Sequence, residues 1–358
     1  MEYSTITETS SNIKHKKRIP FIDLAKGICI LFVVAGHSYL LGSHYNPHFL
    51  NICSVFRMPL YFLLSGLFFK TYKGFFDFLI RKTNKLLIPF TFWHITLSLI
   101  LPAIIIWCTY GRFYFHTIQF HACGIWNNRD NFNMAIWFLL ALFVTNILFY
   151  IIYLLSSIKY IKKFHILSLI TLSIICGVIS YYLRKYSIKL PLYGGTVLAA
   201  MPFFAGGYLI RKYTNILTSA FTWRTIIAMI ICIIPFYFIY HKNCYIMDMR
   251  TNTFRIDSLL IYICGFAGTF FILFISKLFK YIPLISYMGR YSIIILVTHF
   301  PVIRLLRLAY NSMNMHLDRP LRGILFFIVT ITICILLIEP CRRFLPYFTA
   351  QKDIIKRD

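Results

Sequence analysis

Apolar runs long enough to cross a lipid bilayer recur along almost the whole chain, and they constrain its fold more than any other feature. A membrane-spanning helix needs roughly 20 predominantly apolar residues. Ten runs of about that length lie between charged breaks, at residues 21–41, 50–69, 86–108, 134–155, 164–183, 191–210, 222–240, 256–276, 283–303 and 321–338. Because 59% of the residues are hydrophobic and only 13% are charged, a soluble enzyme is excluded. We predict an all-α fold, a polytopic integral membrane bundle of about ten transmembrane helices.

The basic residues between the runs predict the orientation. If the N-terminus is cytoplasmic, the inner segments carry 21 Lys and Arg residues and the outer segments carry 12. Cytoplasmic connections of membrane proteins are enriched in these residues. We therefore expect both termini to be cytoplasmic, with a polar N-terminal tail at 1–18, one membrane domain at 19–345 and a C-terminal tail at 346–358. The only long connection, 109–133, is expected on the outer side.

The net charge of +26 raises the alternative of nucleic-acid binding. The basic residues instead form short clusters beside apolar runs, as anchors facing acidic membrane lipids do, so we expect membrane lipids as partners and no nucleic acid. The ten cysteines lie mostly within apolar runs and show no paired Cys-x-x-Cys spacing. We therefore predict no metal site.

The first run carries three ionisable residues, Asp23, Lys26 and His37. Charged groups within a span are costly and usually face the bundle interior or a water-filled cavity. On a helix, Lys26 and His37 lie within about 20° of the same face and roughly 16 Å apart along the axis, while Asp23 and His37 differ by about 40°. All three can line one interior path from the inner mouth to the outer half.

Each of the three residues also has a structural explanation. Asp23 in the first turn of a helix is favourable by itself. Lys26 can extend its ammonium to the inner interface, and His37 can lie at the outer interface. An imidazole is nevertheless the side chain best suited to proton transfer near neutral pH.

Five blocks resemble the membrane acyltransferase 3 family in the same order along the chain. They are residues 18–38, 56–69, 78–90, 136–144 and 287–299. The family carries an Arg-x10-His pattern in its first span, where this chain has Lys26 and His37. The Lys in this pattern is closer to the branch described as fucose 4-O-acetylase-like, among the polysaccharide O-acetyltransferases. A Lys can pair with phosphate but lacks the bidentate geometry of Arg.

The resemblance implies an O-acyltransferase of the bacterial cytoplasmic (inner) membrane. Such an enzyme moves an acetyl group from acetyl-CoA, a co-substrate, to a hydroxyl of a surface polysaccharide or lipid-linked sugar, with no tightly bound cofactor. His37 would be the catalytic imidazole, as general base or as transient acyl carrier. Asp23 would help to organise the inner part of the path, and Lys26 would help to hold the donor.

Other candidate residues lie near the two ends of the spans. On the inner side, Arg81, Lys82 and Lys85 suit the phosphates of CoA, although positive-inside anchoring explains them equally well, and Arg290 could also touch donor phosphate. On the outer side, Arg57 would stabilise an oxyanion or meet the acceptor, or else lie at the interface. Trp126 in the outer connection could face a carbohydrate or be an interfacial aromatic residue.

His299 lies nine positions after Arg290, so on one ideal helix the two residues point to opposite faces. We therefore predict an interfacial position for His299.

The main alternative function is a multi-span transporter or a glycan flippase, because these proteins also contain ionisable residues inside their spans. A non-catalytic membrane receptor is a third possibility. The ordered five-block resemblance and the lack of clear inverted repeats favour the enzyme.

Overall fold

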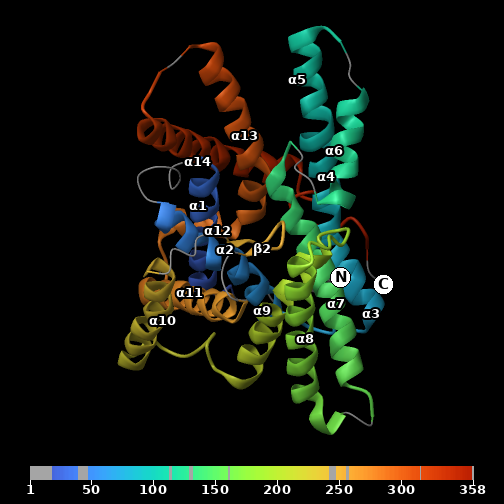
Figure 1. Cartoon of the computed structure of the whole chain (residues 1–358), viewed down its shortest axis with the longest axis vertical. Helices are drawn as coiled ribbons and strands as arrows, with labels where there is room; N and C mark the ends of the chain where they lie inside the picture. Colours follow the sequence, from blue (N-terminus) through green and yellow to red (C-terminus); the bar gives the residue numbers. More distant parts are fainter. Residues whose placement is uncertain are drawn as a thin grey trace, which may run out of the picture.

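The computed structural model describes residues 18–38, 47–112, 115–128, 132–159, 162–241, 247–254, 258–314 and 316–356. Within them, seven helical segments are long and apolar enough to cross a membrane, and two further helices are apolar but shorter. The prediction of an all-α polytopic bundle is confirmed (Figure 1).

Fourteen α-helices and one short strand pair form the described part. The helices are α1 (Pro20–His37), α2 (Pro47–Leu67), α3 (Phe75–Lys82), α4 (Ile88–His94), α5 (Leu101–Tyr110), α6 (Phe115–Asn127), α7 (Trp137–Ser156), α8 (His165–Lys185), α9 (Gly194–Tyr213), α10 (Trp223–His241), α11 (Ser258–Phe279), α12 (Pro283–Arg290), α13 (Ser292–Ser312) and α14 (Arg319–Phe344). Strands β1 (Met247–Asp248) and β2 (Thr253–Phe254) pair antiparallel.

One predicted run and the connection after it have different extents in the structure. The run at 86–108 belongs to one helical segment of 36 residues, Phe75–Tyr110, in which two π-helical turns, η1 (Thr83–Leu87) and η2 (Ile95–Ile100), join α3, α4 and α5. The long connection at 109–133 contains a helix of its own, α6, which runs back alongside η2 (Figure 1).

The predicted run at 283–303 is two helices instead of one span. Helix α12 ends at Arg290, and Tyr291 has a non-helical backbone conformation before α13 begins at Ser292. Because of this break, residues on the two sides of Tyr291 do not follow a single helical phase.

Helix α1 lies inside the bundle, in contact with α2, α11, α12, α13 and α14. Its crossing with α12 is close because both helices have a glycine there. A Cβ atom at Gly289 would overlap the carbonyl of Asp23, and one at Gly27 would overlap the carbonyl of Ile285. Glycine lets two backbones approach in this way. The crossing therefore brings α12 directly against the ionisable first helix.

The strand pair is fastened to α8 and α9 by side-chain hydrogen bonds. The Thr196 hydroxyl donates to the carbonyl of Met249. Asn252, between the strands, donates to the Ser180 carbonyl over 3.2 Å and accepts from the Ser180 hydroxyl over 3.0 Å. Strand β1 also contacts α2. The hairpin is thereby held over the end of the bundle that contains His37.

Candidate active site

A cavity of about 290 Å³ opens in the half of the bundle that the basic residues predict to be cytoplasmic. Its walls come from α1, α2, the end of α3, η1, α7, α12, the start of α13 and the chain after α14. The lining is mainly apolar, with Ile30, Leu139 and Leu296 as examples. Several polar side chains interrupt it, and two of them make hydrogen bonds to neighbouring helices or turns. The Tyr61 hydroxyl donates to the Lys26 carbonyl over 2.9 Å, and Ser65 accepts from Asn146 over 3.1 Å.

Three cations from distant parts of the sequence meet at this cavity. Lys26 comes from α1, Lys82 from the end of α3 and Arg290 from the end of α12. No acidic residue is among the described residues that line the cavity. A cluster of cations in an enclosed site attracts an anion, and the nearby Asp23 carboxylate offsets only part of the charge of Lys26. The structure thus brings together three of the residues that the sequence suggested for donor binding.

The local fold explains why these cations converge. The close crossing at Gly27 and Gly289 places Lys26 next to the last turn of α12, where Arg290 lies. The guanidinium of Arg290 also lies over the ring of Tyr291, with 5.3 Å between its central carbon and the ring centroid. The ammonium of Lys82 lies 5.4 Å from the centroid of the Phe78 ring.

The other inner-side candidates lie outside this cavity. Asp23 pairs with Arg18 over 3.8 Å, and Arg81 pairs with Asp77 over 2.9 Å. The ammonium of Lys85 pairs with Asp353 and donates to the Ala350 carbonyl, both over 2.8 Å. Asp23 is also fourteen positions from His37 on the same helix, roughly 21 Å along the axis. The structure does not bring Asp23 to the imidazole.

At the opposite end of α1, two imidazoles lie against each other. The ring centroids of His37 and His299 are 5.4 Å apart, with 36° between the ring planes. The Phe300 ring contacts His37 edge-on, at a centroid distance of 5.2 Å. Two histidines from different helices, the partly buried His37 of α1 and the fully buried His299 of α13, therefore form one pair beside an aromatic wall.

The prediction that His299 is interfacial was wrong. Its side chain is 0% exposed, because α13 begins afresh after the break at Tyr291 and its helical phase is independent of Arg290. No signal in the sequence marked the break, so the spacing from Arg290 was misleading. The position of His299 had to come from the structure.

The tautomer of His299 follows from its hydrogen bond. Nδ1 lies 2.8 Å from the Ile295 carbonyl, which only accepts, so Nδ1 carries a proton. In the neutral ring Nε2 then holds the lone pair. Nε2 is buried and has no hydrogen-bond partner among the described residues. Such an atom is available as a proton acceptor.

Two arginines lie near the imidazole pair. Arg57 of α2 donates to the Phe32 carbonyl over 3.2 Å. Arg250, in the hairpin turn, pairs with Asp248 over 3.7 Å. Both guanidinium charges interact electrostatically with His37. Sequence reasoning singled out Arg57 but treated Arg250 only as a basic residue of an outer loop.

The last outer-side candidate, Trp126, is on α6, and its side chain is outside what the structure describes. In the described part of the chain, no group of three or more His, Cys, Asp or Glu side chains comes close enough to hold a metal ion.

The imidazole pair lies further along α1 than the described lining of the cavity. The cavity reaches Ile30, and His37 is seven positions further, roughly 10 Å along the axis. Val33 and Val34, both buried, occupy the intervening turns. Along α1 the structure therefore places the cation-lined cavity first and the imidazole pair beyond it, with an apolar layer of Val33 and Val34 between them.

These features define a multi-pass membrane protein with ionisable groups inside its bundle. A family model described as an acyltransferase domain matches residues 19–339. The chain belongs to this acyltransferase 3 family, and it is an acyltransferase. No curated protein and no solved structure matches the chain.

Proposed function

We propose that this acyltransferase moves an acetyl group from acetyl-CoA to a hydroxyl of a surface polysaccharide or a lipid-linked sugar. The observation that carries the proposal is the arrangement along α1, where a cavity with three cations leads toward the paired imidazoles of His37 and His299. The class of acceptor rests on the likeness of the first-span motif to the fucose 4-O-acetylase-like branch. The enzyme would lie in the bacterial cytoplasmic membrane with both termini in the cytoplasm.

The inner cavity suits the donor in charge and in shape. Lys26, Lys82 and Arg290 would bind the phosphates of CoA by charge-assisted hydrogen bonds. The pantetheine arm is long and carries no charge, so it matches the mainly apolar deeper lining. The arm would direct the thioester toward His37 while the nucleotide stays at the cytoplasmic mouth.

In the proposed reaction His37 acts as general base on the acceptor hydroxyl. As the proton passes to the imidazole, the hydroxyl oxygen attacks the thioester carbonyl and forms a tetrahedral oxyanion. The carbon–sulfur bond then breaks, and the CoA thiolate leaves with the proton from His37. General acid–base catalysis of this kind contributes about 10²–10⁴-fold.

Neighbouring groups support this chemistry. Arg57 supplies a positive charge near His37, suited to the developing oxyanion. His299 is proposed as a positioning residue, because its ring contacts His37 and its protonated Nδ1 is fixed by the Ile295 carbonyl. The layer at Val33 and Val34 must open for the thioester to reach His37, which would keep water from the donor between reactions.

The proposal is tested in cells with the gene intact, deleted, or replaced by His37→Ala. Mass spectrometry of surface glycans and lipid-linked sugars should show a mass increment of one acetyl group that is lost on deletion and is not restored by His37→Ala. A matched control is His316→Ala, which removes an exposed histidine outside the site. If glycan acetylation is identical in all strains, the proposed acceptor is wrong.

A further inference from the structure

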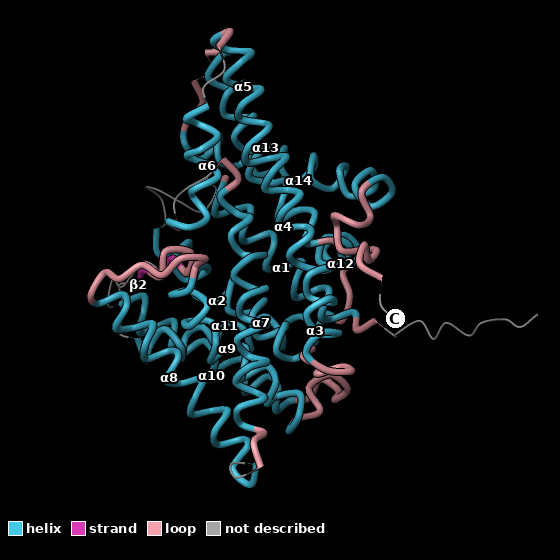
Figure 2. Tube along the Cα trace, turned by 90° about the vertical axis from the view of Figure 1, so that its right-hand side faces the viewer, coloured by secondary structure: helices cyan, strands magenta, loops and turns pink. Residues whose placement is uncertain are grey.

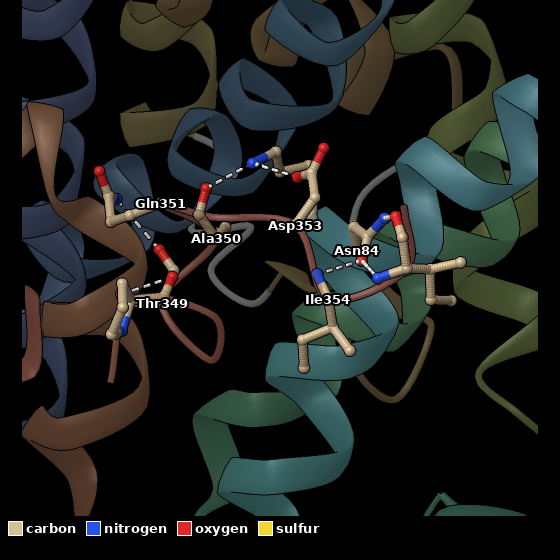
Figure 3. A network of polar contacts seen from close by, with 9 residues as sticks. Asn84, Thr349, Ala350, Gln351, Asp353 and Ile354 are labelled. Atoms are coloured by element: carbon tan, nitrogen blue, oxygen red, sulfur yellow. Dashed lines mark hydrogen bonds and ion pairs between the residues drawn. The ribbon is translucent and has the colours of Figure 1, made fainter. Parts of the chain in front are cut away.

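The chain after α14 folds back over the inner end of the bundle. We call residues 345–356 the C-terminal strap. Figure 3 shows its central part lying against the helical turn that contains Asn84. The last described residues lie beside the end of α3, as Figures 1 and 2 both show, because Asn84 in the turn directly after α3 bonds to them. A sequence reading assigns this segment to a simple tail, yet it is bound to the bundle by a dense set of contacts.

Asn84 fixes the far half of the strap. Its side-chain oxygen accepts hydrogen bonds from the backbone nitrogens of Ile354 and Ile355, over 3.0 and 2.9 Å (Figure 3). Its side-chain nitrogen donates to the Ile355 carbonyl over 3.0 Å. Asn84 is 1% exposed, so its amide is committed to the strap. One buried side chain thus makes three hydrogen bonds to two consecutive residues.

Other contacts fix the near half. The indole nitrogen of Trp93 donates to the Phe348 carbonyl over 2.8 Å, and the rings of Phe92 and Phe348 stack with centroids 3.9 Å apart. Lys85 holds the middle through the Ala350 carbonyl and Asp353. The strap is therefore anchored before and after Thr349 and Gln351.

Those two residues are the part of the strap that lines the donor cavity, together with Lys26, Lys82 and Arg290. Thr349 is buried, and its hydroxyl donates to the Leu345 carbonyl over 3.0 Å. The side-chain amide of Gln351 is exposed and donates to the Thr349 carbonyl over 3.1 Å. Gln351 therefore presents a neutral amide to the cavity that the three cations line.

We propose that the C-terminal strap completes the donor site, with Gln351 as a donor-binding residue and Asn84 as a positioning residue that holds it there. The pantetheine arm has two amide groups, and a Gln side chain can donate to and accept from an amide. The strap would bind the arm where it enters the cavity, between the cations that bind phosphate and the apolar depth that receives the acyl group. This inference rests on the proposed use of acetyl-CoA.

The alternative is that the strap only stabilises the bundle. The two roles differ in what they change. A donor-binding strap alters the dissociation constant of acetyl-CoA and its KM, and it leaves kcat nearly constant. A purely structural strap alters the amount of folded protein and leaves the affinity of the folded fraction unchanged.

The test uses the purified full chain and labelled acetyl-CoA, with equilibrium binding and initial rates measured on the same samples. Gln351→Ala should raise the dissociation constant about 3–10-fold, the effect of one lost hydrogen bond. Gln351→Glu has nearly the same shape but places a negative charge beside the donor phosphates, so it should weaken binding further. Asn84→Ala should weaken binding at least as much as Gln351→Ala.

The matched control is Lys352→Ala. Lys352 is the next residue of the strap, is exposed and does not line the cavity, so wild-type affinity is expected. Asn84 is buried, so its replacement can reduce the yield of folded protein. The two variants of the exposed Gln351 therefore decide the outcome. Unchanged dissociation constants in both Gln351 variants would overturn the inference.

The same samples separate this inference from the proposed function. If wild-type protein binds acetyl-CoA but transfers no acetyl group to any glycan acceptor, the proposed reaction is wrong. The dissociation constants of acetyl-CoA for the Gln351 variants would still decide the role of the strap. Wild-type protein with no saturable binding of acetyl-CoA would end both. Transfer at the wild-type rate with unaltered affinity in the Gln351 variants would end only the role of the strap.

Discussion

Replacing Gly289 by alanine tests how the fold builds the cation cavity. The added Cβ would overlap the carbonyl of Asp23 and approach the backbone nitrogen of Gly27, and backbone atoms cannot move aside as a flexible side chain can. To restore an ordinary contact, α12 must move away from α1 by about 1 Å or more. Overpacking of this kind destabilises a protein by about 1–3 kcal/mol.

The same displacement should affect donor use, because Arg290 directly follows Gly289 and would move away from Lys26. A misplacement of about 1 Å at a reacting site can cost on the order of 10²-fold in rate. We expect Gly289→Ala to lower the melting temperature of the purified protein and to reduce kcat/KM for acetyl-CoA by about 10–100-fold.

Thermal unfolding and initial rates in detergent measure both effects. Leu284→Ala is the matched control, since Leu284 lies on the same short helix, is 56% exposed and does not line the cavity. If Gly289→Ala keeps the melting temperature and kcat/KM of wild type, the close crossing is not what brings the two cations together.

Three further changes address single residues. Lys82→Met should raise the KM for acetyl-CoA by about 10-fold, the effect of a lost charge-assisted hydrogen bond. Lys73→Met, at an exposed lysine, should leave this KM unchanged. If titrations of the donor give equal KM values for Lys82→Met and wild type, Lys82 is not part of the donor site. Arg57→Gln should lower kcat by about 10²–10³-fold with little effect on donor KM, measured by steady-state kinetics; a change confined to KM would contradict an oxyanion role. His299→Phe keeps a ring but removes both nitrogens, so it should lower kcat and change the pH dependence of kcat. If the pH dependence of kcat is unaltered, His299 only packs against His37.

Much of the fold was predictable because its signal is local. A run of apolar residues predicts a membrane span from the sequence alone. Burying an ion in a span is costly, so Lys26 and His37 within the first run are candidate functional residues. The ordered blocks then indicated the family to which the chain belongs. These conclusions need no knowledge of which helix touches which.

The site needed more than local signals. His299 reaches His37 only because the helix breaks at Tyr291. The sequence on both sides of Tyr291 is compatible with a continuous helix, so it did not predict that break. Likewise Gln351 lines the cavity because the strap that carries it is fixed by Asn84, Lys85 and Trp93, more than 250 positions earlier in the sequence. Spacing along one helix can show which residues share a face, but not which distant segment covers that face.

The central claim, acyl transfer from the inner cavity to an acceptor at His37, is tested most directly by following label from acetyl-CoA. Membranes with wild-type protein, His37→Ala or the control His316→Ala are incubated with acetyl-labelled CoA thioester and extracted glycans. We predict that label enters the glycan with wild type and His316→Ala, and that His37→Ala reduces the rate by about 10²-fold or more. Equal label transfer by wild type and His37→Ala would contradict the account.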